Sequence, residues 1–286
     1  MRDTILYGDC LQTLDMLKSH ISIGICDKPR MCVTSPPYYG LRDYGGEDNQ
    51  IGHEDTPEEF VSNLVNIFRK VKDCLAEDGT LWLNMGDSYY NYRPGKGQAL
   101  VKQSVANSKQ DLPDKCARRG NKLDGLKEKD LIGIPWMLAF ALRADGWYLR
   151  QDIIWNKPNP MPESVRDRCT KSHEYIFLLS KNQNYYFNVD AIKEPTRRKR
   201  SVWNITKKGY RDAHFAVYPP DLIIPCIKAG SEKNDIILDP FMGSGTTAMV
   251  AKNLGRYYIG CELHEDYGNL IKNRIGEVRG TLEKFL

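Results

Sequence analysis

Apolar residues over the first 88 positions alternate between short runs and a helical period. The runs at 4–8, 31–34 and 80–85 predict strands, and Leu11, Leu14 and Leu17 form the apolar stripe of a helix after the first of them. Residues 56–75 place apolar side chains three and four apart, which predicts a second amphipathic helix. Its start, Thr56-Pro57 followed by two acidic residues, is typical of a helix N-terminus. Strands and helices in this order predict an α/β fold.

The same alternation returns after residue 130. We expect helices near 131–144 and 219–227, and strands near 147–155 and 174–179. The C-terminal part predicts a strand at 235–239, a glycine-rich turn, a helix at 246–254, a strand at 257–261 and a final helix. A chain of 286 residues with this pattern favours one domain over 1–286, with a core large enough to fold without disulfide or metal staples.

Two basic segments interrupt this pattern. The net charge of the whole chain is only +4, but residues 89–129 hold ten Lys and Arg against four Asp and Glu, and residues 193–211 hold eight against one. The rest of the chain is therefore acidic. Residues 89–129 have no clear period and are rich in Gly, Pro, Asn and Ser, which predicts a long inserted surface loop. The second basic segment extends over 190–212.

Basic segments with a nearby aromatic residue are typical of nucleic-acid interfaces, because Lys and Arg neutralise backbone phosphates. A solvated charged surface is the alternative interpretation. We predict DNA contacts from the second segment at Arg197, Arg198, Lys199, Arg200 and Trp203, and from the first at Arg118 and Arg119.

Several classes of protein are disfavoured. No apolar run approaches the roughly 20 residues that cross a bilayer, and the first residues lack the apolar core of a signal peptide. The eight cysteines are scattered without a C-x-x-C pair, which argues against a zinc ribbon and a disulfide framework. We therefore predict a cytoplasmic protein with reduced thiols and no metal.

A glycine-rich turn follows the predicted strand at 235–239. Glycines allow a tight turn and a close approach of the backbone to a ligand, and the following helix offers free N–H groups. Glu262 ends the next strand, where an acid can accept hydrogen bonds from ribose hydroxyls. A phosphate-binding loop is excluded because no Lys follows the last glycine, and an ordinary turn is the alternative. The cofactor-binding candidates here are Asp239, Pro240, Phe241, Gly243, Ser244, Gly245, Thr246 and Glu262.

A second motif, Ser35-Pro36-Pro37-Tyr38, follows the buried strand that ends at Thr34. Two prolines fix the direction of the backbone carbonyl between them. Ser35 adds a hydroxyl acceptor, and Tyr38 adds a flat ring on which a base can stack. A turn that merely ends the strand is the alternative interpretation.

These two motifs resemble those of S-adenosylmethionine-dependent DNA amino-methyltransferases. Ser35-Pro36-Pro37-Tyr38 is similar to the family's catalytic motif, and Asp239-Pro240-Phe241-x-Gly243-x-Gly245 to its cofactor loop. The catalytic motif comes first, which is the permuted order of the beta group. Weaker matches are Gly8-Asp9-Cys10, 155–158 and 173–175.

The resemblance implies a Rossmann-like S-adenosylmethionine-dependent methyltransferase fold: a mostly parallel central sheet, helices on both faces, permuted motifs and basic inserts for DNA. S-adenosylmethionine would be the cofactor and double-stranded DNA the partner, with 190–212 as the candidate target-recognition region. Asp9 and Cys10 would contact the adenine, with Thr34 also in the cofactor site. Glu262 would bind the ribose, and the loop at 241–246 the methionine part.

The resemblance also implies roles for the catalytic motif. The Ser35 hydroxyl and the Pro36 carbonyl would accept the two hydrogens of an exocyclic base amine, Pro37 would fix the backbone, and Tyr38 would stack on the flipped base. Within the family, Ser in the first motif position is typical of cytosine N4 enzymes, and Asp or Asn of adenine N6 enzymes. We therefore predict cytosine N4, with adenine N6 as the alternative.

An RNA or small-molecule methyltransferase would use the same cofactor loop, and a catalytically inactive DNA-binding protein is a further interpretation. Pro225-Cys226 is similar to the nucleophile pair of cytosine C5 enzymes, but it lies on a predicted helix without attendant motifs, so we expect a buried structural cysteine. A homodimer and a cognate restriction endonuclease are the further partners that the resemblance implies.

Overall fold

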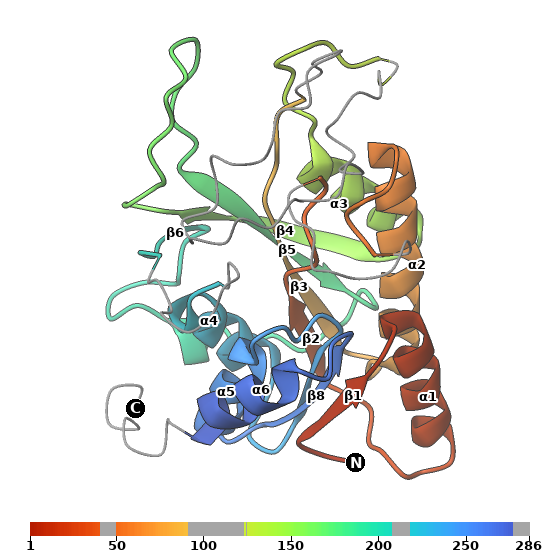
Figure 1. Ribbon diagram of the computed structural model, residues 1–286. Helices are drawn as coiled ribbons and strands as arrows, with labels where there is room; N and C mark the ends of the chain where they lie inside the picture. Colours follow the sequence, from red (N-terminus) through yellow and green to blue (C-terminus); the bar gives the residue numbers. More distant parts are fainter. Residues whose placement is uncertain (41–49, 91–122, 124, 208–217, 277–286) are drawn as a thin grey trace.

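The computed structural model describes residues 1–40, 50–90, 123, 125–207 and 218–276. Within them lies one eight-stranded sheet with helices on both faces (Figure 1). The strands are β1 (Thr4–Tyr7), β2 (Met31–Thr34), β3 (Thr80–Met85), β4 (Tyr148–Asn156), β5 (His173–Ser180), β6 (Val202–Asn204), β7 (Ile236–Asp239) and β8 (Tyr257–Glu262). The helices are α1 (Cys10–Ser22), α2 (Pro57–Cys74), α3 (Ile134–Ala144), α4 (Pro220–Gly230), α5 (Thr246–Asn253) and α6 (Tyr267–Gly276). A short 3₁₀ turn spans Asp190–Ile192.

The sheet is mostly parallel, in the order β1-β8-β7-β2-β3-β5-β4-β6. The first five strands in this order run parallel to one another. β5 is antiparallel to both of its neighbours, β3 and β4, and β6 pairs parallel to β4 at the far edge. The predicted α/β class and mostly parallel sheet are therefore confirmed.

Two apolar layers hold the helices on the sheet. One layer packs Leu14 of α1, Leu64 of α2 and Leu138 of α3 against one face of the sheet. The other packs α4, α5 and α6 against the opposite face, with Leu222 and Ile271 among its buried residues. Because the parallel strands are covered on both sides, β2, β3 and β7 are buried at every position. This explains their continuous apolar runs in the sequence.

Helix α3 begins later than its sequence pattern predicts, at Ile134 rather than near 131. Gly133 adopts a left-handed backbone with φ 88°, and the helix has no cap from its own N-cap side chain. The Asp87 carboxylate, which follows β3, accepts the N–H groups of Gly133 at 3.0 Å and Ile134 at 3.2 Å instead. A residue distant in sequence therefore caps this helix, which the local pattern does not reveal.

The ends of the 89–129 segment lie against each other. Tyr90 accepts the N–H of Lys129 at 2.9 Å and donates its own N–H to Asp130 at 2.8 Å. Tyr90 is buried, and its hydroxyl accepts the N–H of Leu123 at 3.0 Å. These tyrosine contacts tie the two ends of the segment to the domain. No helix among the described residues is long and apolar enough to cross a membrane.

The predicted start of α2 is confirmed. The Thr56 hydroxyl accepts the N–H of Glu59 at 3.1 Å, and Pro57 occupies the first turn. This cap satisfies one of the N–H groups that a helix start leaves without a partner.

Replacing Thr56 by Ala should lower the free energy of unfolding by about 1 kcal/mol, because this N–H loses its acceptor. Urea denaturation measures the change, and Thr56→Ser, which keeps the hydroxyl, is the matched control. Equal unfolding midpoints for Thr56→Ala and the wild type would show that the cap contributes no stability.

Candidate functional site

The predicted motifs meet at one edge of the sheet. Ser35 follows β2, Asp239 ends β7, Glu262 ends β8, and Asp9 follows β1. These four strands are parallel and adjacent, so their carboxyl ends lie at the same edge (Figure 1). Ligands of open α/β sheets bind at this edge. The structure therefore brings together motifs that lie more than 200 residues apart.

A buried carboxylate connects the two main motifs. The Thr34 hydroxyl donates to Asp239 Oδ1 at 2.6 Å, and the backbone N–H of Phe241 donates to the same oxygen at 3.0 Å. The hydroxyls of Thr247 and Tyr218 donate to Asp239 Oδ2 at 2.5 Å and 3.2 Å. Burial raises the pKa of the Asp239 carboxyl, while the bonds from Thr247 and Thr34 act against that shift.

These contacts give Thr34 and Asp239 a structural role beside the cofactor-site role predicted for them. Asp239 is only 1% exposed, and its two oxygens already accept four hydrogen bonds from the protein. A carboxylate has about four lone-pair positions, so these protein donors already use most of its hydrogen-bonding capacity, and direct contact with a cofactor stays a prediction. The two side chains hold the loop after β7 to the end of β2. Tyr218, which the sequence did not single out, completes this arrangement.

The glycine turn has the backbone that its sequence predicts. Gly243 and Gly245 adopt φ values of 52° and 81°, in the left-handed region that glycine tolerates best. A Cβ at Gly245 would lie 2.9 Å from Cγ2 of Ile271, so α6 also requires a glycine there. The buried Ser244 hydroxyl accepts a hydrogen bond from Arg274 of α6, another contact that the sequence pattern did not reveal. Pro240 is buried and Phe241 is half-buried in the same turn.

Glu262 lies beside this turn. Its carboxylate accepts the N–H of Gly243 at 2.7 Å and that of His264 at 3.1 Å. Each oxygen accepts one of these bonds, which leaves further lone pairs for a ligand. Burial raises the pKa of the Glu262 carboxyl, and the two backbone donors act in the opposite direction.

Two buried polar atoms near the turn have no hydrogen-bond partner in the part of the chain that the structure describes. They are Oγ1 of Thr246 and Nε2 of His264. Unsatisfied buried polar atoms are costly and uncommon, and at a ligand-binding edge they indicate a polar group still to be bound.

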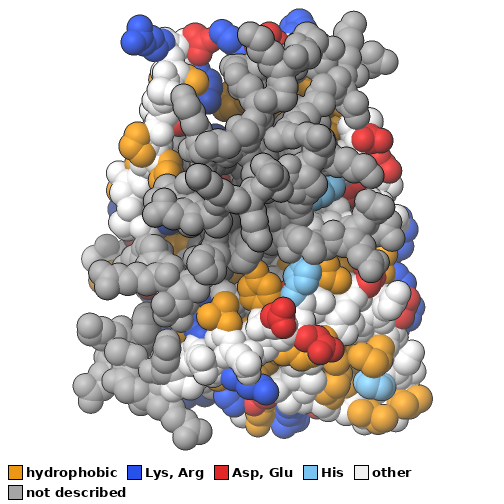
Figure 2. All heavy atoms as spheres, viewed as in Figure 1, with side chains coloured by type: hydrophobic (Ala, Val, Ile, Leu, Met, Phe, Trp, Pro, Cys, Tyr) orange, Lys and Arg blue, Asp and Glu red, His pale blue; other side chains and the backbone are white. Residues whose placement is uncertain are grey.

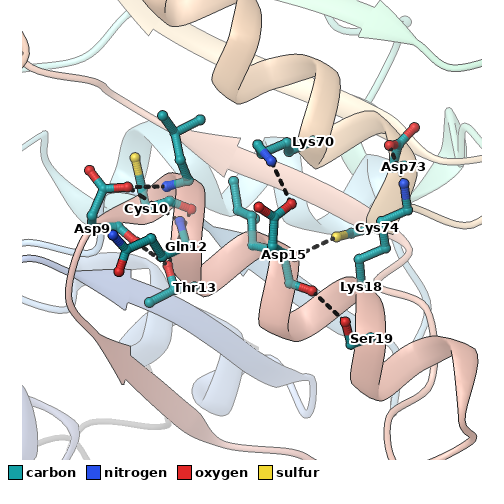
Figure 3. Close-up of polar contacts among 12 residues, drawn as sticks. Asp9, Cys10, Gln12, Thr13, Asp15, Lys18, Ser19, Lys70, Asp73 and Cys74 are labelled. Atoms are coloured by element: carbon teal, nitrogen blue, oxygen red, sulfur yellow. Dashed lines mark hydrogen bonds and ion pairs between the residues drawn. The ribbon is translucent and has the colours of Figure 1, made fainter.

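Asp9 caps helix α1 (Figure 3). Its Oδ1 accepts the N–H groups of Leu11 at 2.8 Å and Gln12 at 3.2 Å. The adjacent Cys10 is buried, and burial raises the pKa of its thiol. Farther along the helix, ion pairs such as Lys18–Asp73 at 2.8 Å attach α1 to α2. The N–H of Gly8, the residue before Asp9, donates to the Glu262 carbonyl at 2.9 Å, so the chain leaves β1 beside the end of β8.

The Ser35-Pro36-Pro37-Tyr38 motif leaves β2 with Ser35 half-buried and Pro36 buried. The Tyr38 hydroxyl donates to Glu174 Oε2 at 2.9 Å and lies 3.4 Å from Asn84 Oδ1. Burial and the Glu174 charge raise the pKa of Tyr38, and a hydrogen bond from the Ser35 side chain acts against them. A small pocket beside Tyr38 is lined by Tyr38, Tyr39, Gly86, Asp87, Ser88 and Ile134.

The basic segment at 190–212 lies partly outside the described residues, and Arg118 and Arg119 lie outside them entirely. Arg197, Arg198 and Arg200 are exposed, and the Arg197 guanidinium pairs with Glu194 at 2.6 Å. Acidic and basic side chains are interspersed on the described surface shown in Figure 2.

Trp203 corrects the sequence prediction. It lies in the centre of β6, 4% exposed, in the apolar layer shared with α4, and its indole N–H donates to the Arg200 carbonyl at 2.7 Å. A ring buried in this way packs the edge of the sheet and cannot stack on DNA in this conformation. Cys226 is buried in α4, as predicted for a structural cysteine.

Comparisons with known proteins agree with this geometry. A family described as DNA methylase, of the N6/N4 type, matches residues 30–273. The type II methyltransferase M.Cfr9I of Citrobacter freundii is 47% identical over 277 residues, covering 95% of this chain and 87% of that protein.

Two solved structures have a similar fold. The PvuII DNA methyltransferase, described as cytosine-N4-specific, superimposes with a TM-score of 0.69 at 17% identity, covering 100% of this chain and 90% of that one. The M1.HpyAVI–SAM complex gives a TM-score of 0.58 at 19% identity, with 95% and 98% coverage. At these identities the likeness establishes the fold alone.

Thr34→Val should lower the free energy of unfolding by about 1–3 kcal/mol, because a buried carboxylate loses a donor. Thr247→Val removes a donor from the other oxygen of the same carboxylate and should cost a similar amount. Because both bonds share Asp239, the loss in the double variant should depart from the sum by at least about 0.5 kcal/mol. Urea denaturation measures all three variants, and unchanged stability of Thr34→Val would contradict the role assigned to this bond.

Proposed function

The chain belongs to the N6/N4 family of DNA methylases, and on that premise we propose that it methylates the exocyclic N4 amine of cytosine in double-stranded DNA. The enzymes of this family are S-adenosylmethionine-dependent DNA methyltransferases. The observation that carries the proposal is the place of Ser35. It directly follows Thr34, whose hydrogen bond to Asp239 holds the end of β2 against the glycine turn.

The residues at the turn fit S-adenosylmethionine, which supplies an electrophilic methyl group when it is bound. Gly243, half-buried and with no described side-chain atom within 4 Å of the position of a Cβ, lets a ligand approach the backbone of the turn closely. The free lone pairs of Glu262 suit ribose hydroxyls, and the unpartnered Thr246 Oγ1 and His264 Nε2 offer further polar contacts. Asp9 uses one oxygen as a helix cap, which leaves the other for an adenine amine.

To catalyse this reaction, the protein has to make a weakly nucleophilic amine more reactive. The lone pair of an exocyclic amine is delocalised into the base, so the nitrogen is close to planar. Two acceptors, the Ser35 hydroxyl and the Pro36 carbonyl, would bind its two hydrogens and stabilise the positive charge that develops on nitrogen. The prolines hold the carbonyl in place, and the Tyr38 ring would stack on the base once it has left the duplex. No covalent bond to the protein is required.

Cytosine N4 is preferred over adenine N6 because the first position of the motif is Ser35. Serine offers a neutral acceptor, whereas the family's adenine enzymes typically have Asp or Asn there. The fold neighbour from the PvuII system is itself described as cytosine-N4-specific. Adenine N6 is the alternative outcome of the test below.

The surface around β6 offers candidate contacts for the DNA backbone. Exposed Arg197, Arg198 and Arg200 would bind backbone phosphates, together with Lys199, whose ammonium lies 5.0 Å from the centre of the Trp203 ring. The relative from Citrobacter freundii is a type II methyltransferase, which supports a role in restriction–modification. The homodimer and the cognate restriction endonuclease stay predictions.

Ser35→Ala should reduce kcat for methyl transfer to duplex DNA by roughly 10²–10³-fold, the usual effect of removing one group that stabilises transition-state charge. The affinity for S-adenosylmethionine should change little. The assay uses a labelled methyl donor and unmethylated genomic DNA, followed by digestion and mass spectrometry of the nucleosides. Ser22→Ala, at the exposed end of α1, is the matched control.

We expect N4-methylcytosine as the product of the wild-type chain. N6-methyladenine would replace the proposal by its alternative, and no methylated nucleoside would overturn it. Wild-type turnover by Ser35→Ala would remove Ser35 from the mechanism.

The proposed role of Glu262 predicts a pH dependence. An ionised carboxylate accepts ribose hydroxyls, and burial raises the pKa of this carboxyl above its ordinary value. Affinity for S-adenosylmethionine should therefore decrease as the pH falls, beginning at a higher pH than for an ordinary glutamate. Calorimetric titration from neutral to mildly acidic pH measures this effect.

Glu262→Gln should weaken binding at neutral pH by roughly 10- to 100-fold, the expected loss of hydrogen bonds to a charged group. In this variant the affinity should also depend less on pH. This loss of pH dependence distinguishes titration of the Glu262 carboxyl from titration of the ligand itself. A variant with the wild-type pH profile would contradict the role of Glu262.

A further inference from the structure

A cluster of polar side chains lies behind Tyr38, and the proposed chemistry does not use it. It consists of Glu174 on β5, Asn84 on β3 and Lys157, which directly follows β4. These three strands are neighbours in the sheet. β5 is antiparallel to both, so its beginning lies at the same edge as the ends of β3 and β4. Glu174 therefore faces the edge at which the catalytic motif leaves β2.

Three hydrogen bonds hold the Glu174 carboxylate in place. Oε1 accepts a hydrogen bond from the Lys157 ammonium, and Oε2 accepts the Asn84 amide at 3.3 Å and the Tyr38 hydroxyl at 2.9 Å. Asn84 is itself held by a bond from its amide to the Tyr175 carbonyl at 3.1 Å. Glu174 thus connects Tyr38 to the rigid centre of the sheet.

Lys157 is the ion-pair partner of this carboxylate in a partly dry environment. The side chains of Lys157 and Glu174 are only 15% and 16% exposed, so both charges have lost much of their water. Each charge compensates the other, which is what a buried ion pair requires. The Lys157 ammonium also lies 4.3 Å from the centre of the Trp155 ring, a cation–π contact that limits where it can move.

The ring of Tyr38 is fixed from a second direction by Gly86. A Cβ at Gly86 would lie 2.7 Å from Cε2 of Tyr38 and 3.3 Å from the Glu174 side chain. The glycine therefore lets the ring and the carboxylate pack directly against the end of β3. The hydroxyl bond and the contact at the ring edge therefore hold the ring at two places.

We propose that Glu174, held by Lys157 and Asn84, is a positioning residue that fixes the Tyr38 ring and through it the stacked target base. This inference rests on the proposed function, because it assigns a purpose to Tyr38 in that reaction. Orientation of the base matters because its amine must meet the acceptors and the methyl donor at once, and small misplacements reduce rates strongly.

The experiment is a double-mutant cycle between Tyr38→Phe and Glu174→Gln. Tyr38→Phe keeps the ring but removes the hydroxyl, and Glu174→Gln replaces a charge-assisted bond by a weaker neutral one. Steady-state methylation of unmethylated genomic DNA gives kcat and the KM values for DNA and S-adenosylmethionine. We expect each single variant to lose roughly 10- to 100-fold in kcat with nearly unchanged KM for S-adenosylmethionine. The double variant should be no slower than Tyr38→Phe.

A matched pair elsewhere in the chain provides the control. The Tyr186 hydroxyl donates to Glu232 Oε1 at 3.4 Å on the exposed surface. Tyr186→Phe and Glu232→Gln remove the same chemical groups away from the catalytic edge, and they should keep wild-type kcat.

Glu174→Gln leaves Lys157 without its partner, so its unfolding midpoint is measured in parallel. Tyr38→Phe keeps the ion pair and tests the inference even if Glu174→Gln folds poorly. Wild-type kcat in Tyr38→Phe, or multiplicative losses in the double variant, would overturn the inference while the wild-type chain still methylates DNA. A wild-type chain that forms no methylated base would instead overturn the proposed function.

Discussion

The hydrogen bond between Thr34 and Asp239 is the contact on which the site depends. β2 and β7 are adjacent and parallel, with Cys32 paired to Leu238, so the two chain segments leave the sheet side by side. Burying a carboxylate is costly unless donors replace its water, and four donors do so here. Three of these donors belong to the C-terminal part of the chain: Tyr218 before α4, Phe241 in the glycine turn and Thr247 in α5. The fourth, Thr34, ends β2 directly before Ser35. The same bond that satisfies Asp239 therefore holds the glycine turn after β7 beside the Ser35-Pro36-Pro37-Tyr38 motif after β2.

The antiparallel direction of β5 determines which of its residues lie at the same edge of the sheet as the site. In a fully parallel sheet the beginning of a strand lies at the edge opposite the site. Because β5 runs the other way, its first residues, including Glu174, lie at the edge where the Ser35-Pro36-Pro37-Tyr38 motif leaves β2. β4 ends at that same edge, which brings Lys157 beside Glu174. The strands on this side of the sheet thus supply side chains behind Tyr38, whereas β7 and β8 lead into the glycine turn and Glu262.

The sequence predicted the parts of the site that follow strands directly, because a strand end and its adjacent turn are local features. It predicted the turn at Gly243 and Gly245 and the cap at Thr56, since both depend on residues within a few positions. It did not predict contacts between distant positions, such as Arg274 on Ser244 or Glu174 on Tyr38, which lie 30 and 136 residues apart. The prediction that Trp203 contacts DNA was wrong because the surrounding residues are basic and the strand has only three residues. Its burial depends on the pairing of β6 with β4, which the local sequence does not indicate.

Acidic side chains of the site lie deeper in the protein than the basic side chains around β6, and the small net charge of +4 does not reveal this separation. The acidic groups Asp239, Glu262 and Glu174 lie inside the carboxyl edge, where each accepts several hydrogen bonds. The exposed cations Arg198 and Arg200 lie outside it, in the segment around β6. The sulfonium of the methyl donor is cationic and the DNA backbone is anionic. Negative groups therefore favour binding of the first, and positive groups favour binding of the second. Lys157 compensates the charge of Glu174, so the negative field near the sheet comes from Asp239 and Glu262, whose burial limits screening by salt, and the exposed Arg198 and Arg200 supply the positive field at the surface.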